Sequence, residues 1–187
     1  MNDTDKYILD TIRTYVWSGF YDTDDVHQEI DDILEDDADE VMLRSAVAIE
    51  FEKKAVSEAS WPDETDCDRL NQVFDQLNAK GIIALQNAGY TMSDGLSDVG
   101  EELHQRGRES TSGYCFYHGQ DLERAVSGGG LMLAFGDLDD DKTGKTEIGI
   151  SVRDVLESNG FTTEWNGDPE TRINIPNIDW KRRYSQQ

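Results

Sequence analysis

Residues 131–149 read LMLAFGDLDDDKTGKTEIG, and this stretch decides how the chain can fold. Its first five residues, LMLAF, are apolar without interruption, which is typical of a strand that is covered on both faces. We therefore predict a central strand at residues 131–135, whose odd-numbered and even-numbered side chains are buried on opposite faces of a sheet.

The GKT triplet at residues 144–146 invites comparison with a phosphate-binding loop. Such a loop requires a glycine five residues before the first glycine of the triplet, and the chain has Asp139 at that position. The nearby carboxylates of Asp137, Asp140 and Asp141 would also repel a phosphate by on the order of several kcal/mol in a desolvated site. The sequence therefore excludes a phosphate-binding loop here.

The same residues match only the first half of a calcium-binding loop. Positions one, three, five and six of that loop correspond to Asp139, Asp141, Thr143 and Gly144. Position twelve, which should supply a bidentate glutamate, is Ile150. We therefore expect residues 137–145 to be an exposed, mobile loop without bound metal or phosphate, and Thr143 or Thr146 to cap the helix that follows.

Strand and helix patterns alternate on both sides of this stretch. Strands are predicted at 82–86, 113–118, 131–135, 161–165 and 172–175, with amphipathic segments between them. This alternation is typical of an α/β fold, and we predict a mixed, largely parallel sheet of about five strands flanked by helices. Because the helix predicted at 119–126 is short, an α+β two-layer sandwich is the alternative.

Residues 1–60 are predicted to form an acidic helical part. Apolar residues recur at helical spacing in 5–20, 22–37 and 40–58, and the third of these segments has an apolar face that includes Ile49 and Ala55. The segment SWPDETD, with Pro62, then marks a boundary. We assign the α/β domain to residues 61–187, although the two parts could share one core.

Negative charge is the strongest global feature of the sequence. Forty Asp and Glu residues against 17 Lys and Arg residues give a net charge of −23. Such a field repels nucleic-acid backbones and anionic membranes, so we expect neither as a partner. Two interpretations stay open: adaptation to solubility or a saline cytoplasm, and an acidic face that binds a basic protein. Near the end of the sequence, three consecutive residues are basic: Lys181, Arg182 and Arg183. They could form a basic patch that packs on the acidic body of the protein, or a motif that docks to a partner.

The sequence favours a cytoplasmic protein. Its first residues, MNDTDKYILD, have neither the basic nor the apolar region of a secretion signal, and no apolar run is long enough to span a membrane. Cys67 and Cys115 lie within apolar patterns and make no disulfide framework. We expect both to be buried, slowly reacting thiols.

Polar residues follow three of the predicted strands and suggest one candidate site. In a parallel sheet the carboxyl ends of the strands form one rim, and ligands bind there. The rim residues would be Thr91, Ser93, Asp94, His118, Gln120, Asp121 and Asp137. His118 and Asp121 are the catalytic candidates, Asp94 and Asp137 the metal ligands, and the others line the rim. A divalent metal is the one cofactor this set could hold, although none is expected.

Four longer stretches of the sequence resemble a known family. They are NAGYTMSDG, GYCFYHGQDLERAV, GGGLMLAFG and EWNGDPETRINI followed by a Trp, within residues 61–183. They resemble an uncharacterised bacterial domain family of unknown function. The resemblance implies a small intracellular bacterial protein and implies no activity, catalytic residue or cofactor.

Two functions are compatible with these features. The first, which we prefer, is a non-enzymatic acidic module that binds a protein partner, because the charge is strong and no catalytic signature is complete. The alternative is a metal-assisted hydrolase or small-ligand binder that uses the acidic rim at the strand ends, with His118 and the carboxylates holding an ion that activates water.

Overall fold

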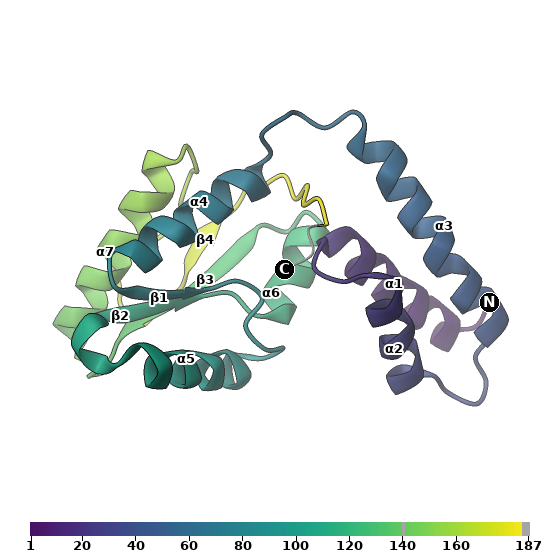
Figure 1. The fold of residues 1–187 in the computed structure, drawn as a ribbon, viewed down its shortest axis with the longest axis horizontal. Coiled ribbons are helices and arrows are strands. Elements are labelled where there is room, and N and C mark those ends of the chain that lie inside the picture. Colours follow the sequence, from purple (N-terminus) through teal and green to yellow (C-terminus); the bar gives the residue numbers. More distant parts are fainter. Residues whose placement is uncertain (140, 185–187) are drawn as a thin grey trace. The chain divides into compact units, whose positions relative to one another are not determined.

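The computed structural model describes residues 1–139 and 141–184, so Asp140, one of the carboxylates expected to repel a phosphate, lies outside the described residues. The chain forms two compact units. Residues 1–65 and the described residues from Trp180 onward make the helical unit, and Asp66–Asp179 make the sheet unit (Figure 1). This division lies at residue 65 instead of 60, and it places the end of the chain with the N-terminal helices.

Three helices build the helical unit: α1 (Asp3–Ser18), α2 (Thr23–Ile33) and α3 (Glu40–Glu58). Each begins at a side-chain cap, because Asn2, Asp22 and Asp39 accept hydrogen bonds from backbone N–H groups of the first turn. The apolar stripes of the helices meet in one core. Its buried members are Ile8, Ile12, Val16, Val26, Ile30, Leu43 and Val47.

The buried face of α3 differs from the predicted one. Leu43, Val47, Glu50 and Lys54 are buried, whereas Ile49 is 50% exposed. Two charged residues can be buried because their charges are paired or hydrogen-bonded. Glu50 accepts hydrogen bonds from Lys53 Nζ (2.8 Å) and Trp17 Nε1 (3.3 Å), and Lys54 Nζ donates to Val16 O (3.0 Å). The spacing of apolar residues does not predict this face, because two of its buried residues are charged.

The basic end of the chain is fastened to aromatic residues of the helical unit. Trp180 Nε1 donates a hydrogen bond to Ser18 O (3.0 Å). The guanidinium of Arg182 lies 4.0 Å from the ring centroid of Phe20, and that of Arg183 lies 5.7 Å from the ring of Trp61. These cation–π contacts hold the predicted basic patch on the unit.

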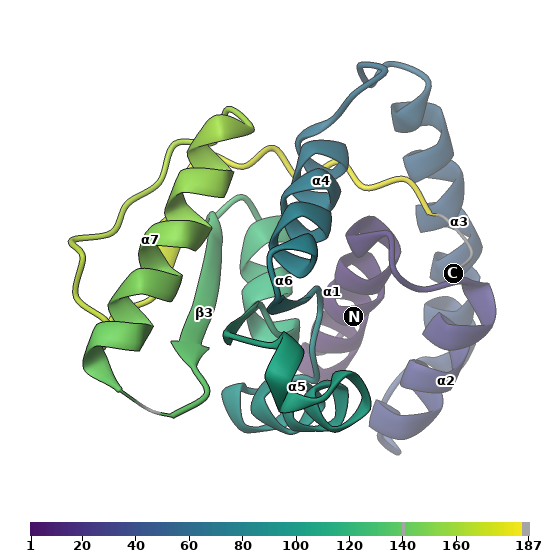
Figure 2. The ribbon, with the colours of Figure 1, turned by 60° about the vertical axis from the view of Figure 1, so that its left-hand side comes forward.

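The sheet unit contains a four-stranded sheet with helices on both faces. Its helices are α4 (Asp66–Ala79), α5 (Met92–Arg106), α6 (Gly119–Val126) and α7 (Lys142–Ser158), with a 3₁₀ turn at Arg108–Ser110. The strands β1 (Ile82–Leu85), β2 (Gly113–Phe116), β3 (Leu131–Asp137) and β4 (Ile173–Ile175) lie in this order across the sheet. Figure 1 shows α4 and α7 above the sheet and α5 below it, and Figure 2 shows α7 along β3. The fold is mixed α/β.

The prediction of a largely parallel sheet is wrong. β1 and β2 are parallel, but β2–β3 and β3–β4 are antiparallel. The connection between β2 and β3 explains this, because its eight-residue helix spans only about 12 Å. After the C-cap, Ser127, come three glycines, of which Gly128 and Gly130 have left-handed φ values of 80° and 81°. The chain therefore turns back at the end of the sheet where β2 finishes.

The central strand at LMLAF is confirmed. β3 pairs with β4 through Leu131–Leu133 and with β2 through the residues after them, and Leu131 and Leu133 are fully buried. On the opposite face Ala134 is buried, but Met132 is only half-buried, so the predicted burial of both faces is wrong at that position. The strand predicted at 161–165 is reduced to one antiparallel bridge between Glu164 and Asn174. Both cysteines are buried as expected, and burial raises the pKa of the Cys115 thiol far above its ordinary value. None of the described helices combines the length and the apolar composition needed to cross a bilayer.

Candidate functional site

The loops that follow β1 and β2 lie side by side and are joined by backbone hydrogen bonds. Ala88 N donates to Tyr117 O (2.9 Å), Gly119 N to Gly89 O (2.9 Å) and Gln120 N to Tyr90 O (3.2 Å). Because these two strands are parallel, their carboxyl ends meet at one edge, as the rim hypothesis required. The structure therefore brings the Thr91–Asp94 turn close to the His118–Asp121 turn.

His118 is the N-cap of α6. Its Nδ1 accepts a hydrogen bond from Asp121 N (3.4 Å), and the Asp121 carboxylate lies 3.5 Å from His118 N, which completes a capping box. Both side chains are buried, with relative exposures of 4% and 3% for the two residues. The sequence had suggested that they approach each other, and this contact is present.

Arg172 completes a charged group that the sequence analysis missed. Its Nη1 lies 2.9 Å from both Asp121 Oδ1 and Asp121 Oδ2, and 3.5 Å from His118 Nε2. Arg172 immediately precedes β4, far along the chain from α6, so no local pattern connects the two. We call His118, Asp121 and Arg172 the strand-end cluster.

The contacts of the imidazole assign its proton to Nε2. Nδ1 accepts a backbone N–H, so its lone pair is occupied, while Nε2 lies 3.2 Å from Asp121 Oδ2 and can donate to that carboxylate. In this neutral tautomer both ring nitrogens have partners. His118 then has no lone pair available to bind a metal or to abstract a proton. Its role is to cap α6 and to orient the carboxylate of Asp121.

Asp94 performs the same capping function at α5. It forms a capping box with Thr91, whose Oγ1 and N donate to Asp94 Oδ2 at 2.8 and 2.9 Å. The hydrogen bond from the Thr91 hydroxyl, with backbone N–H donors of Thr91 and Tyr90, lowers the pKa of Asp94. Asp94 is therefore a carboxylate already satisfied by its own turn.

The remaining rim residues offer little to an anion. Ser93 and Gln120 are exposed at the first turns of α5 and α6. The first-turn N–H groups of α6 that would bind an anion already donate to Gly89, Tyr90 and the His118 ring. The N-terminus of α6 is thus closed by protein atoms.

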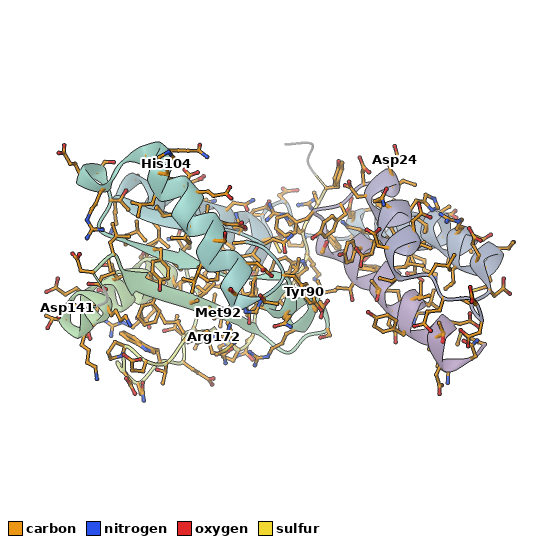
Figure 3. The ribbon with its side chains drawn as sticks, turned by 90° about the horizontal axis from the view of Figure 1, so that it is seen from below. Asp24, Tyr90, Met92, His104, Asp141 and Arg172 are labelled. Carbon is orange, nitrogen blue, oxygen red and sulfur yellow. The ribbon has the colours of Figure 1, made fainter. Side chains whose placement is uncertain are left out.

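Asp137 does not belong to this site. It ends β3 and pairs with Gly113 at the beginning of β2, so the antiparallel β3 puts it at the opposite edge of the sheet from His118. In Figure 3, Tyr90 and Asp141 accordingly lie towards opposite ends of the sheet unit. The prediction that all seven rim residues gather together is wrong because it assumed a parallel β3.

At its own edge Asp137 organises the start of α7. Its carboxylate accepts the N–H of Asp141 (3.0 and 3.1 Å), and Asp141 caps the helix by accepting the N–H of Gly144 (3.0 Å). Asp141, rather than Thr143 or Thr146, is therefore the cap. Residues 142–145 form the first helical turn instead of a loop.

Within the described residues, no group of three or more His, Cys, Asp or Glu side chains is arranged to hold a metal ion. The separation of Asp137 removes one intended ligand, and the occupied ring of His118 removes another. Among the residues described at the two edges of the sheet, neither those around His118 nor those around Asp137 have a metal site's geometry.

A second surface of interest lies on the helical unit. Eleven of the residues between 22 and 40 are Asp or Glu, and none is Lys or Arg. We call residues 22–40 the acidic segment; it comprises the α2 cap, α2 and the turn to α3. Nine of its carboxylates are exposed. Asp24, labelled in Figure 3, points outward from α2.

Few of these carboxylates are neutralised. Arg44 forms ion pairs with Asp31 and Glu40, and among the described residues it is the one cation paired with the segment. The side-chain carboxylates of Asp24, Glu35 and Asp36 make no hydrogen bond or ion pair with any part of the chain that the structure describes. A concentrated negative surface therefore faces solvent.

The family is evident from a comparison of the whole chain with protein-family models. The model described as "Domain of unknown function (DUF6891)" matches residues 1–184. The chain belongs to this family. DUF6891 thus spans the helical unit as well as the stretches that suggested a resemblance over residues 61–183. No curated protein and no solved structure matches the chain.

Proposed function

We propose that this protein is a non-enzymatic acidic module that binds a basic protein partner in the bacterial cytoplasm. The observation that carries the proposal is the acidic segment, whose exposed carboxylates greatly outnumber the one arginine paired with them. The partner presents a lysine- or arginine-rich surface to α2 and to the turn that follows it.

Electrostatics explains why such a surface suits a cationic partner. Like charges held close together on one helix repel one another, and a cationic surface relieves this repulsion when it binds. Complementary charge also accelerates association and makes it sensitive to salt. The carboxylates that cap α2 and α3 hold the segment in place, while those without partners remain available to bind.

The alternative, a metal-assisted hydrolase or small-ligand binder at the strand ends, receives less support. It needs His118 as a ligand or base, but both ring nitrogens have protein partners. It also needs Asp137 beside His118, and that residue lies at the other edge of the sheet. We therefore place the strand-end cluster among the structural elements of the fold.

The test measures binding of a short lysine-rich peptide by titration calorimetry at low and high salt. In the segment variant, Asp32→Asn, Glu35→Gln and Asp36→Asn remove three negative charges. A control variant removes three charges from exposed positions in the sheet unit, through Asp75→Asn, Glu101→Gln and Glu147→Gln. We expect the segment variant to bind about tenfold more weakly and the control less than about threefold.

The control separates a binding face from general acidity. Equal weakening by both variants would mean that the peptide responds to net charge alone, as expected for adaptation to a saline cytoplasm. Absence of binding to the unmodified protein at low salt would also refute the proposal.

A further inference from the structure

A hollow of about 300 Å³ opens in the helical unit beside the acidic segment. It lies between the beginning of α2, the later turns of α3 and Tyr184. Phe51, Ala55 and the ring of Tyr184 supply apolar surface, while Asp22 and Glu58 add carboxylates. We call this feature the α3 hollow. Asp22 is also the first residue of the acidic segment, so the two features are continuous.

The charges around the α3 hollow are held by local contacts. Lys54 also lines the hollow. Its Nζ donates a hydrogen bond to Val16 O (3.0 Å) and lies 3.8 Å from Glu58 Oε1. Partial burial, together with the charges of Asp22 and Asp25, raises the pKa of Tyr184, whose phenol hydrogen-bonds to Asp22. The hollow therefore combines aromatic walls with acceptor oxygens.

Its size suits one side chain. Small-molecule pockets usually measure about 300–1,000 Å³, so the α3 hollow is at the lower limit for a free ligand. A large aromatic residue is a better fit, because its ring can pack against Phe51 and Tyr184. An indole N–H, which seeks an acceptor when buried, would find the carboxylates of Asp22 or Glu58.

We propose that the α3 hollow anchors one aromatic side chain, best a tryptophan, of the basic partner. The inference rests on the proposed function, since the acidic segment attracts the partner and the hollow fixes its position. Tryptophan anchors in central pockets commonly dominate the affinity of protein interfaces.

The experiment compares two lysine-rich peptides that differ at one central position, tryptophan in one and alanine in the other. Each is titrated into the full chain, into Ala55→Phe, which fills the hollow, and into Ala48→Phe. Ala48 is the matched control, since it is also an exposed alanine of α3 but lies two turns before Ala55 and does not line the hollow. Thermal unfolding confirms that both variants fold.

We expect the tryptophan peptide to bind the full chain about tenfold more tightly than the alanine peptide. Ala55→Phe should abolish this advantage and leave the salt-dependent binding of the alanine peptide unchanged, while Ala48→Phe should preserve both. Equal binding of the two peptides would overturn the anchor and leave the acidic face standing. A tryptophan advantage that survives Ala55→Phe would place the contact elsewhere and overturn it too.

Two further outcomes are decisive. Failure of both peptides to bind would refute the proposed function and the anchor together. Self-association of the full chain that Ala55→Phe removes would assign the hollow to a second copy of the protein and overturn the anchor for a basic partner.

Discussion

The strand-end cluster and the acidic segment use the same kind of side chain for opposite purposes. Asp121 is buried, and its carboxylate lies 2.9 Å from Arg172 Nη1 and 3.2 Å from His118 Nε2. Asp24, Glu35 and Asp36 are exposed, and no described residue pairs with them. A carboxylate that is buried must be satisfied inside the fold, whereas one left in water costs the fold little.

The carboxylates without partners in the fold are the ones available to a binding partner. His118 and Asp121 resembled a catalytic pair in the sequence. In the structure they cap α6, and Asp121 pairs with Arg172 beside β4. The residues that resembled simple solubility are the ones left without partners.

The largest effect is expected from Asp121→Ala. The change leaves Arg172 without its carboxylate and removes half of the α6 capping box, so the free energy of unfolding should fall by about 3 kcal/mol. Urea denaturation measures it. In the Asp121→Ala/Arg172→Ala double variant the additional loss should be small, because the pair is already broken. A loss below about 1 kcal/mol for Asp121→Ala would show that the cluster does not hold the fold.

A smaller effect is expected at the helix cap. His118→Ala should lower stability by about 1–2 kcal/mol, because Asp121 N loses its acceptor. His118→Asn is the matched variant, since asparagine is a good cap, and it should recover most of the loss. If asparagine is as damaging as alanine, the imidazole has a role beyond capping.

The third prediction concerns pH and Asp94. The Thr91 hydroxyl and backbone donors lower the pKa of this carboxyl below its ordinary value of 3.8 in the folded protein. Its contribution to stability is therefore present above pH 3.8 and is lost as the pH falls through the lower folded pKa. Asp94→Asn should be less stable than the unmodified chain near neutral pH, and the gap between their urea midpoints should narrow below pH 3.8. A gap independent of pH would refute it.

The smallest effect on stability belongs to the acidic segment. The variant Asp32→Asn, Glu35→Gln, Asp36→Asn should change the free energy of unfolding by no more than about 0.5 kcal/mol, and in the stabilising direction, because repulsion is relieved. Thermal and urea unfolding measure it beside the control triple in the sheet unit. Marked destabilisation would mean that these carboxylates support the fold, and the contrast would collapse.

Much of the local structure was accessible from the sequence. The bounds of α3 were predicted, as were the strand at LMLAF, the buried cysteines and the contact of His118 with Asp121. Each depends on residues within a few positions of one another, where the spacing of apolar side chains and the capping geometry act directly.

Only part of the candidate site could be predicted from the sequence. Thr91 and Asp94 do approach the His118 turn, because β1 and β2 are parallel. Asp137 does not, because two glycines after α6 return the chain at the same end of the sheet. Arg172 left no local signal, since its partner Asp121 is 51 positions earlier in the chain.

The sequence by itself determined the charge of the protein, its helices and its central strand, since composition, periodicity and caps act over single turns. Tertiary structure decided the direction of β3, the ion pair of Arg172 and the attachment of the chain's end to the helical unit. These features depend on contacts between residues that are far apart in the sequence. Polar groups that become buried need hydrogen-bonding or charged partners, and such partners come from distant segments of the chain.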